Sequence, residues 1–287
     1  MLPSGFLLID KPLGLSSNHA LSALKRKGIR MKIGHTGTLD PFATGLLVVG
    51  LGEALKFIQY LQEEPKVYEA TLTLGEKTDT LDCTGTIIET RSVPLLSLEN
   101  IEKVFEKIKK QTSQIPPMFS AKKKDGQRLY DLARQGQEIE RAPQTIAISS
   151  LELIHWDATS ISFRTSVSKG TYIRVLGEDI AQELGTLGHL KSLRRISAGS
   201  FSVSQSMSLD EEVTVEKIIP LDIALSHWTS VELSNLEVTK ILCGQKIYNN
   251  IFEKYSGIVR VHSLERFLGM GEIQQNCLTP LRLMAGN

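Results

Sequence analysis

The chain has 287 residues, and its 41% hydrophobic content together with 22 glycines lies in the range of globular domains, which excludes disorder as the main state. At roughly 150 residues per domain, this length favours one large and one small domain. The 33 basic and 32 acidic residues give a formal charge of +1, which excludes the global positive field of a strongly basic nucleic-acid binder, so any nucleic-acid surface must be local.

The cysteines and the N-terminal segment indicate the cellular compartment. Cys83, Cys243 and Cys277 lie far apart and form no C-x-x-C pair, which argues against a disulfide framework and a structural zinc site. The N-terminal segment has no basic n-region, and its apolar run is too short for a signal peptide. We therefore expect a protein of the reducing cytoplasm that has no membrane association.

Short strands and helices alternate in the first third of the chain. Gly28 is a natural stop for the first helix, and the apolar residues after Ser97 recur at spacings of three and four, which is typical of an amphipathic helix. The expected elements are a helix from Ser16 or Ser17 to about Lys27, a loop over 30–45, a strand at Leu46–Gly50, a helix at Glu53–Leu61, a strand at Val67–Leu74 and a helix from Ser97 to about Lys110.

The rest of the chain contains an excursion and a separate C-terminal segment. Residues 111–143 include a Pro-Pro pair and a lysine-rich turn, which indicate a departure from the core. We expect a larger domain over 1–225 and a small β-rich domain over 228–287. The other expected elements are strands at 145–154 and 160–167, a helix at 171–184, a helix opened by the capping box Ser234-x-x-Glu237, and strands at 257–261, 267–273 and 281–284.

Basic residues gather in three local clusters. Residues 25–32 hold five basic side chains and no acidic one, and residues 107–128 hold seven against the single Asp125. The third cluster is Lys191, Arg194 and Arg195. Any one cluster can be an ordinary solvated face, but three of them beside loops indicate a phosphate-contacting surface.

The loop from Gly34 to Gly45 carries the residues best suited to chemistry. Its glycines allow a close backbone approach, and His35 and Asp40 place an imidazole and a carboxylate in one loop. Taken alone, the segment also fits a tight loop with Asp40 as a cap. Residues 45–52 match neither a P-loop nor a dinucleotide fingerprint, so no nucleotide cofactor is expected, and the acidic stretch at 79–82 indicates a turn between strands.

Six segments in chain order resemble the motifs of one family. His35-x-Gly37-x-Leu39-Asp40-x-x-x-x-Gly45 is similar to the catalytic motif of the bacterial tRNA pseudouridine synthases that isomerise uridine 55 in the TΨC loop. The other segments are Lys11-Pro-x-Gly14, Lys66-Val-Tyr68, Gly75-x-x-Thr78-Asp79-Thr80-x-Asp82-x-x-Gly85, Ser168-Lys-Gly-Thr-Tyr172-Ile-Arg174 and His189-Leu-Lys-Ser-Leu193-Arg-Arg195. Their common order over residues 5–203 makes the resemblance specific.

The resemblance implies a fold and a substrate. It implies an α+β fold, with a mixed, mainly antiparallel sheet of the pseudouridine-synthase type, flanking helices, an RNA-gripping thumb at about 111–143 and a small C-terminal PUA-like barrel. The implied reaction converts a uridine in the TΨC stem-loop of tRNA to pseudouridine, without a cofactor or a metal ion. The implied enzyme is a monomer that needs no protein partner.

The resemblance also implies roles for individual residues. Asp40 would add covalently to the sugar or the base, or assist the loss of a ribose proton, and these routes stay open. Arg174 would keep that carboxylate ionised, and Tyr68 would stack on the flipped uracil and act on a proton. The implied substrate-binding residues are Tyr172 and Leu193 in the pocket wall, His35 in the space left by the extruded nucleotide, and Lys122, Lys123 and Arg195 near the RNA backbone.

Two other interpretations remain at this point. A synthase of the same family could act on another RNA, or through a guide RNA and partner proteins, although the thumb and the absence of long extensions favour a stand-alone tRNA enzyme. A non-catalytic RNA-folding protein could keep the same scaffold. The presence of Asp40, Tyr68, Tyr172 and Arg174 argues against it, because binding alone would not require that set.

Overall fold

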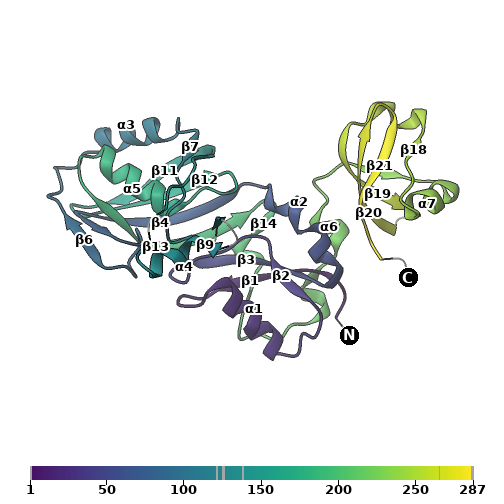
Figure 1. The fold of residues 1–287 in the computed structure, drawn as a ribbon, viewed down its shortest axis with the longest axis horizontal. Helices are drawn as coiled ribbons and strands as arrows, with labels where there is room; N and C mark the ends of the chain where they lie inside the picture. The colour runs from purple at the N-terminus through teal and green to yellow at the C-terminus, as the bar shows by residue number, and fades with distance from the viewer. Residues whose placement is uncertain (1, 121, 125–126, 138, 265, 286–287) are drawn as a thin grey trace.

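Two β-sheets of different size organise the molecule (Figure 1). The computed structural model describes residues 2–120, 122–124, 127–137, 139–264 and 266–285, without the side chains of Lys123, Lys124, Arg128 and Arg134. The larger sheet runs along the long axis of the molecule, and the smaller sheet, formed by the C-terminal segment, lies at one end.

The larger sheet has ten strands and is mixed but mainly antiparallel. Among its described strand pairs, β13–β3 and β1–β15 are the parallel ones. Its order across the sheet is β11 (Ile148–Trp156), β12 (Ser160–Val167), β4 (Lys66–Leu74), β13 (Gly188–Ala198), β3 (Thr44–Leu51), β1 (Gly5–Lys11) and β15 (Met207–Ser208). Three short strands add to it: β2 (Ile33–His35) on β3, β14 (Phe201–Ser202) on β13 and β16 (Ile218–Ile219) on β1.

Two long helices, α3 (Leu98–Ile108) and α5 (Ile173–Glu183), pack together beside one half of the sheet (Figure 1). Ser97 caps α3 by accepting a hydrogen bond from the Asn100 N–H, and Ser16 caps α1 (Ser17–Arg26) in the same way. Outside the segment between α3 and β11, the other helical segments before the C-terminal sheet are η1 (Gly52–Phe57), α2 (Ile58–Gln62), η2 (Val203–Gln205), η3 (Val215–Lys217) and α6 (Leu221–Ala224). The helix expected at 53–61 is therefore a 3-10 segment followed by a short α-helix.

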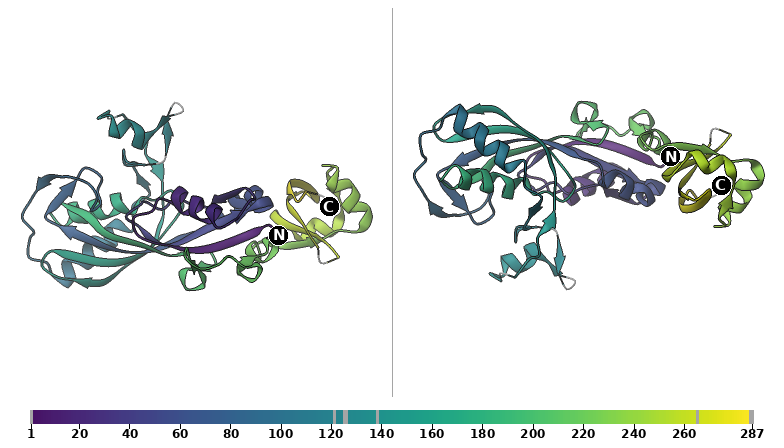
Figure 2. Two further views of the ribbon diagram at one scale, coloured as in Figure 1. Left: turned by 90° about the horizontal axis from the view of Figure 1, so that it is seen from below. Right: turned by 90° about the horizontal axis from the view of Figure 1, so that it is seen from above.

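The segment between α3 and β11 projects away from the sheet (Figure 2). Its root is a two-stranded sheet of β7 (Ser113–Gln114) and β10 (Gln144–Thr145), and its outer part contains β8 (Lys123–Lys124), β9 (Gln127–Arg128) and α4 (Leu129–Arg134). We call residues 111–143 the thumb. A second hairpin, of β5 (Glu76–Thr78) and β6 (Ile87–Thr90), encloses the turn at residues 79–86, as the acidic stretch there indicated.

The C-terminal sheet packs against the larger one through its own apolar face. Its order is β17 (Ser230–Glu232), β19 (Gly257–Ser263), β20 (Arg266–Gln274), β21 (Cys277–Leu283) and β18 (Ile247–Tyr248), with α7 (Asn235–Leu242) and η4 (Asn250–Lys254) beside it. Met270 and Phe267 of β20 join a buried cluster with Phe57 of η1, whose ring centroid lies 5.6 Å from that of Phe267. Asp222 of α6 accepts hydrogen bonds from Arg260 and His262 of β19 at 2.6 and 2.8 Å.

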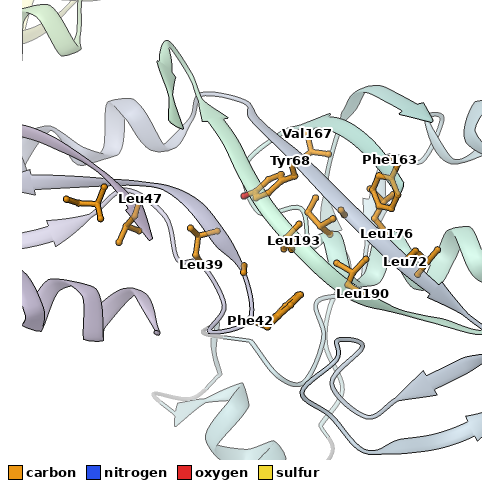
Figure 3. Close-up of a cluster of buried hydrophobic side chains, with 14 of the residues drawn as sticks. Leu39, Phe42, Leu47, Tyr68, Leu72, Phe163, Val167, Leu176, Leu190 and Leu193 are labelled. Atoms are coloured by element: carbon orange, nitrogen blue, oxygen red, sulfur yellow. The ribbon is translucent and has the colours of Figure 1, made fainter. Parts of the chain in front are cut away.

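The main core lies between the larger sheet and its helices (Figure 3). It includes Leu72 and Tyr68 of β4, Leu193 of β13, and Leu39 and Phe42 from the loop before β3. Because the loop residues are buried in the same cluster as the sheet residues, the loop is fixed against the sheet. No helix in the described part of the chain is both long and apolar enough to cross a membrane.

Candidate active site

Asp40 lies in a loop that its neighbours fasten on three sides. The buried hydroxyl of Ser17 accepts a hydrogen bond from the Leu39 N–H at 2.8 Å, and the Gly14 N–H donates to the Pro41 carbonyl at 2.8 Å. The Ala43 N–H donates to the Asp40 carbonyl at 3.1 Å, which closes a turn around the carboxylate-bearing residue. These backbone hydrogen bonds therefore fix the position of Asp40 independently of the contacts of its side chain.

The loop ends at Gly45, where two strands approach each other closely. Gly45 pairs with Arg195 in the parallel β13–β3 contact, and its φ is +99°. A Cβ built on Gly45 would lie 2.3 Å from the Arg195 carbonyl oxygen. Both the backbone conformation and the lack of space require glycine here, which explains the last glycine of the motif.

Arg174 binds the Asp40 carboxylate from its buried side. The Arg174 Nε lies 2.9 Å from Asp40 Oδ2, and the arginine side chain is only 4% exposed, whereas that of Asp40 is 34% exposed. The other guanidinium nitrogens donate to the carbonyls of Thr80 and Phe119 at 2.8 and 2.7 Å. The guanidinium is thus held in one orientation, and the carboxylate keeps an accessible edge.

Asp82 is a second carboxylate beside Arg174, and its role was not expected from the sequence. Its Oδ2 lies 3.5 Å from Arg174 Nη1, and its side chain is 6% exposed. Its Oδ1 accepts hydrogen bonds from the Thr84 N–H at 3.0 Å and the Thr84 hydroxyl at 2.6 Å. The turn at 79–86 therefore orients this carboxylate toward Arg174. The only signal in the sequence was the matching segment Gly75–Gly85.

The charge of Asp40 depends on opposing influences. The pKa of the Asp40 carboxyl is raised above its ordinary value, because burial has the largest effect and the Asp82 carboxylate adds to it, while the Arg174 guanidinium lowers it. Lys11, the last residue of β1, also favours the ionised form. Lys11 is itself fully buried, its ammonium donates to the carbonyls of Pro12 and Leu15 at 2.9 and 2.6 Å, and burial lowers its pKa to about 8.

A cavity of about 530 Å³ opens over Asp40. This volume lies within the range of about 300–1,000 Å³ that is usual for small-molecule sites. Tyr68, Leu193, Tyr172 and Arg174, four of the residues expected at the site, line it together with Asp40. Figure 3 shows the Tyr68 ring and the Leu193 side chain on neighbouring strands of the sheet. Burial raises the pKa of the Tyr172 phenol, which therefore stays protonated at neutral pH.

Neither His35 nor Lys122 is among the residues that line the cavity. His35 is the last residue of β2 and is half-buried, and it lies just before the first loop residue that lines the cavity, Thr36. Burial lowers the pKa of the His35 imidazole. Lys122 is exposed, and its ammonium lies 3.4 Å from Gln144 Oε1 at the thumb root. The side chain of Lys123 lies outside the described residues.

Arg195 differs from the expectation of an RNA-facing cation. It lines the cavity but is only 2% exposed, because its Nε donates to the Leu46 carbonyl at 2.6 Å and its Nη2 to the Gly37 carbonyl at 3.1 Å. Arg194 forms an ion pair with Asp10 at 2.7 Å. Of the cluster expected at 191–195, Lys191 alone is exposed, whereas Arg194 and Arg195 bind groups of nearby strands and of the Asp40 loop.

The described residues contain no group of three or more His, Cys, Asp or Glu side chains arranged to hold a metal ion. The cavity lining includes one accessible carboxylate, the buried guanidiniums of Arg174 and Arg195, two lysines, two tyrosines and apolar side chains. Such a set can bind a flat apolar base and present a single anion to it.

Comparisons with known proteins show which family the chain is similar to. A family model described as TruB family pseudouridylate synthase (N terminal domain) matches residues 23–173, and one described as Pseudouridine synthase II TruB, C-terminal, matches residues 229–284. The tRNA pseudouridine synthase B of Hydrogenovibrio crunogenus is 43% identical over 97% of this chain and 93% of its own length. That of Marinomonas sp. is 39% identical over 98% and 94%.

The fold has solved counterparts as well. A chain in the crystal structure of a Cbf5-Nop10-Gar1 complex superposes with a TM-score of 0.73 at 22% identity, covering 97% of this chain and 84% of its own. Fold and matched models define the class of protein as a pseudouridine synthase, which is an isomerase. Within this class, the chain belongs to the TruB family. The expected family, enzyme class and α+β fold are thereby confirmed.

Proposed function

We propose that the protein converts uridine 55 in the TΨC loop of tRNA to pseudouridine, with the target nucleotide flipped into the cavity and Asp40 as the catalytic group. The observation that carries the proposal is the ion pair of Asp40 and Arg174, at 2.9 Å, in the wall of the cavity. The substrate is inferred from the curated relatives, which carry the name tRNA pseudouridine synthase B at about 40% identity over nearly the full chain.

The reaction needs a group that handles a separated sugar and base. The N1–C1′ bond breaks, a C5–C1′ bond forms, C5 loses a proton and N1 gains one, so the product is an isomer. The Asp40 carboxylate can add to the sugar or the base, or assist the loss of a ribose proton. Each route requires its ionised form, which Arg174 favours and burial opposes.

The other wall residues are suited to holding the base. Tyr68 and Leu193 present an aromatic ring and an apolar side chain on adjacent strands, against which an extruded uracil can stack. Tyr172, next to the arginine-bearing helix, closes the cavity wall. The phenol of Tyr68 is the group we assign to proton transfer at the base. A buried pocket also keeps the detached uracil from escaping.

The surface around the cavity is suited to folded RNA. Lys122 and Lys123 of the thumb are proposed to contact the RNA backbone, and His35 to fill the space that the extruded nucleotide leaves. Arg195 is assigned a different role from the expected one, because its buried guanidinium holds the carbonyl of Gly37 in the Asp40 loop. Arg195 thus stabilises the loop that carries Asp40.

An assay with purified components tests the proposal. The protein, alone and without added cofactor, is incubated with an unmodified tRNA transcript, and pseudouridine is mapped at single-nucleotide resolution. The expected result is one new pseudouridine, at position 55, formed by the protein without a partner. Modification at another position, or conversion only after a guide RNA or a partner protein is added, would contradict the proposed substrate or the proposed independence.

A further inference from the structure

The thumb root is tied to the start of the helix that carries Arg174. Gln114 of β7 is only 4% exposed. Its side-chain Oε1 accepts a hydrogen bond from the Tyr172 N–H at 2.8 Å, and its Nε2 donates to the Tyr172 carbonyl at 3.2 Å. The glutamine amide therefore pairs with the backbone of Tyr172 as a neighbouring strand would, and it fixes both the position and the orientation of that residue.

Tyr172 is the N-cap residue of α5 and directly precedes its first residue, Ile173. The φ and ψ of Tyr172 are −93° and 110°, and its own side chain makes no capping hydrogen bond. The direction in which the first turn leaves Tyr172 decides where the side chain of Arg174, two residues later, reaches. Gln114 lies outside the helix, and its side chain fixes the backbone of Tyr172, from which α5 starts.

The thumb also holds the other end of the same arginine. Arg174 Nη2 donates to the carbonyl of Phe119, which lies five residues after Gln114 in the thumb. The backbone at the start of α5 and the tip of the guanidinium are therefore both fixed by the segment 114–119. A displacement of this segment would shift Arg174 relative to Asp40.

Gln114 is absent from the residues that line the cavity, so any effect on the chemistry is transmitted through other residues. The thumb root does not depend on it alone, because β7 and β10 pair at two positions and the Ile146 N–H donates to the Thr112 carbonyl at 3.0 Å. The thumb is therefore attached to the sheet even without the two hydrogen bonds between Gln114 and Tyr172.

We propose that Gln114 is a positioning residue for the isomerisation, which acts by fixing Tyr172 and, through α5, the Arg174 guanidinium that pairs with Asp40. The inference rests on the proposed function for the choice of substrate. It differs from a simple anchoring role, because a misplaced Arg174 slows the chemical step after RNA is bound, whereas a loosened thumb weakens RNA binding.

The test compares Gln114→Met with the unaltered protein in single-turnover reactions on the tRNA transcript. Methionine has a similar length and no amide, so neither hydrogen bond to Tyr172 can form. We expect the rate constant at saturating enzyme to fall by about 10- to 100-fold, the range that a small misplacement of a catalytic group produces. The dissociation constant for tRNA is expected to change less than about threefold, because the cavity and the thumb surface are intact.

Two further variants make the result specific. Gln182→Met changes an exposed glutamine on α5 itself and is expected to leave both constants unchanged. Gln114→Asn keeps an amide but is one methylene shorter, so it cannot make both hydrogen bonds to the Tyr172 backbone, and a smaller fall in rate is expected. This variant carries the test if Gln114→Met does not fold, and a normal rate for it would then refute the proposal.

The possible outcomes separate the two levels of inference. No conversion by the unaltered protein would contradict the proposed substrate and, because the inference rests on it, the role of Gln114 in this reaction as well. Conversion by the unaltered protein with a normal rate for Gln114→Met would overturn the positioning role alone. A weaker dissociation constant with an unchanged rate constant would also overturn it, because Gln114 would then only anchor the thumb.

Discussion

Asp40 is a carboxylate whose charge is supported by one strong partner. The Arg174 Nε at 2.9 Å favours the ionised form, while burial and the nearby Asp82 oppose it. Asparagine at position 40 has nearly the same shape and can still accept a hydrogen bond from Arg174. The substitution therefore removes the charge and the nucleophile without emptying the site.

We predict that Asp40→Asn lowers the single-turnover rate by at least about 10³-fold, as the loss of a central catalytic group does. The midpoint of thermal unfolding and the affinity for tRNA are expected to change little. Asp157→Asn, which alters a turn carboxylate bonded to Thr159 far from the cavity, is the matched control. Pseudouridine formation at a normal rate by the Asp40 variant would remove this residue from the chemistry.

The sequence predicted which residues meet at the cavity better than it predicted how they are held. Asp40, Tyr68, Tyr172 and Arg174 line one cavity, as their motifs implied. Asp82 lay in a matching segment but had no expected role, because local spacing does not reveal which distant carboxylate faces a guanidinium. The burial of Arg195 was missed for a similar reason, since its acceptors, the carbonyls of Leu46 in β3 and Gly37 in the Asp40 loop, lie far away in the chain.

At the scale of elements, the thumb is the part proposed to grip RNA. It projects from the sheet (Figure 2), and its outer part carries the three consecutive lysines 122–124, of which Lys122 is exposed. A cation that contacts a phosphate releases a counterion, so each such cation adds to the salt dependence of binding.

We predict that the combined reversal of Lys122, Lys123 and Lys124 to glutamate weakens tRNA binding by about 10- to 100-fold at moderate salt. The slope of log affinity against log salt is expected to fall by up to about 3, which is about one for each lysine that neutralises a phosphate. Binding is measured by filter retention over a series of salt concentrations. Lys103→Glu on α3, an exposed lysine paired with Glu99, is the control, and an unchanged slope in the triple variant would exclude the thumb from the interface.

Asp179 of α5 is a half-buried carboxyl that is less acidic than an ordinary aspartate. Burial raises the pKa of Asp179 to about 6, and the like charges of Glu178 and Glu183 add to this, while a hydrogen bond from Gln111 opposes it. A carboxyl whose pKa is higher in the folded than in the unfolded chain binds its proton more tightly in the folded chain. Its ionisation therefore costs stability, and the cost develops between about pH 4 and 6 and is complete above that window.

We predict that Asp179→Asn stabilises the protein by about 1–2 kcal/mol at pH 7.5, after discounting for the partial exposure of the side chain, and by little at pH 4.5. Asparagine resembles the protonated acid, so the variant lacks the ionisation cost. Denaturant unfolding at the two pH values measures the difference. Glu102→Gln, at an exposed position of α3, is the control, and an equal effect at both pH values would show that Asp179 ionises normally.

Helices and strands were predictable where the side chains repeat regularly and a capping residue is present. The helix that begins after Ser97 and the one that begins after Ser234 both start at their caps. The expected helix at 53–61 was only partly right, since its first half is 3-10. Apolar spacing of three and four residues does not distinguish the two over one turn, because i and i+3 share a face in both.

At the scale of the whole molecule, a formal charge of +1 gave little information about RNA binding. The exposed cations Lys25, Arg26, Lys27, Arg30 and Lys122 are balanced by acidic residues elsewhere in the sequence, so the net charge hides their separation. Net charge is also a poor guide because some cationic side chains are buried and form hydrogen bonds within the fold. Arg260, for example, is largely buried and donates to the Trp228 carbonyl at 2.8 Å, as well as to Asp222.

The junction between the two sheets depends on this polar contact and on an apolar cluster. Asp222 of α6 accepts from both Arg260 and His262, whose side chains are 15% and 9% exposed. Phe57, Phe267 and Met270 form the apolar part. If Asp222 is removed, two largely buried donors lose their common acceptor, and leaving such groups unpaired costs stability.

We predict that Asp222→Ala lowers the free energy of unfolding by about 1–3 kcal/mol, the cost of hydrogen bonds to a charged group. The expected sign is a lower midpoint of thermal unfolding, with α7 and the C-terminal sheet exchanging their amide hydrogens faster than the larger sheet does. Asp210→Ala, at an exposed position in the turn after β15, is the control. An unchanged midpoint with unchanged exchange would mean that the apolar cluster alone joins the two sheets, and that Asp222 contributes nothing to their contact.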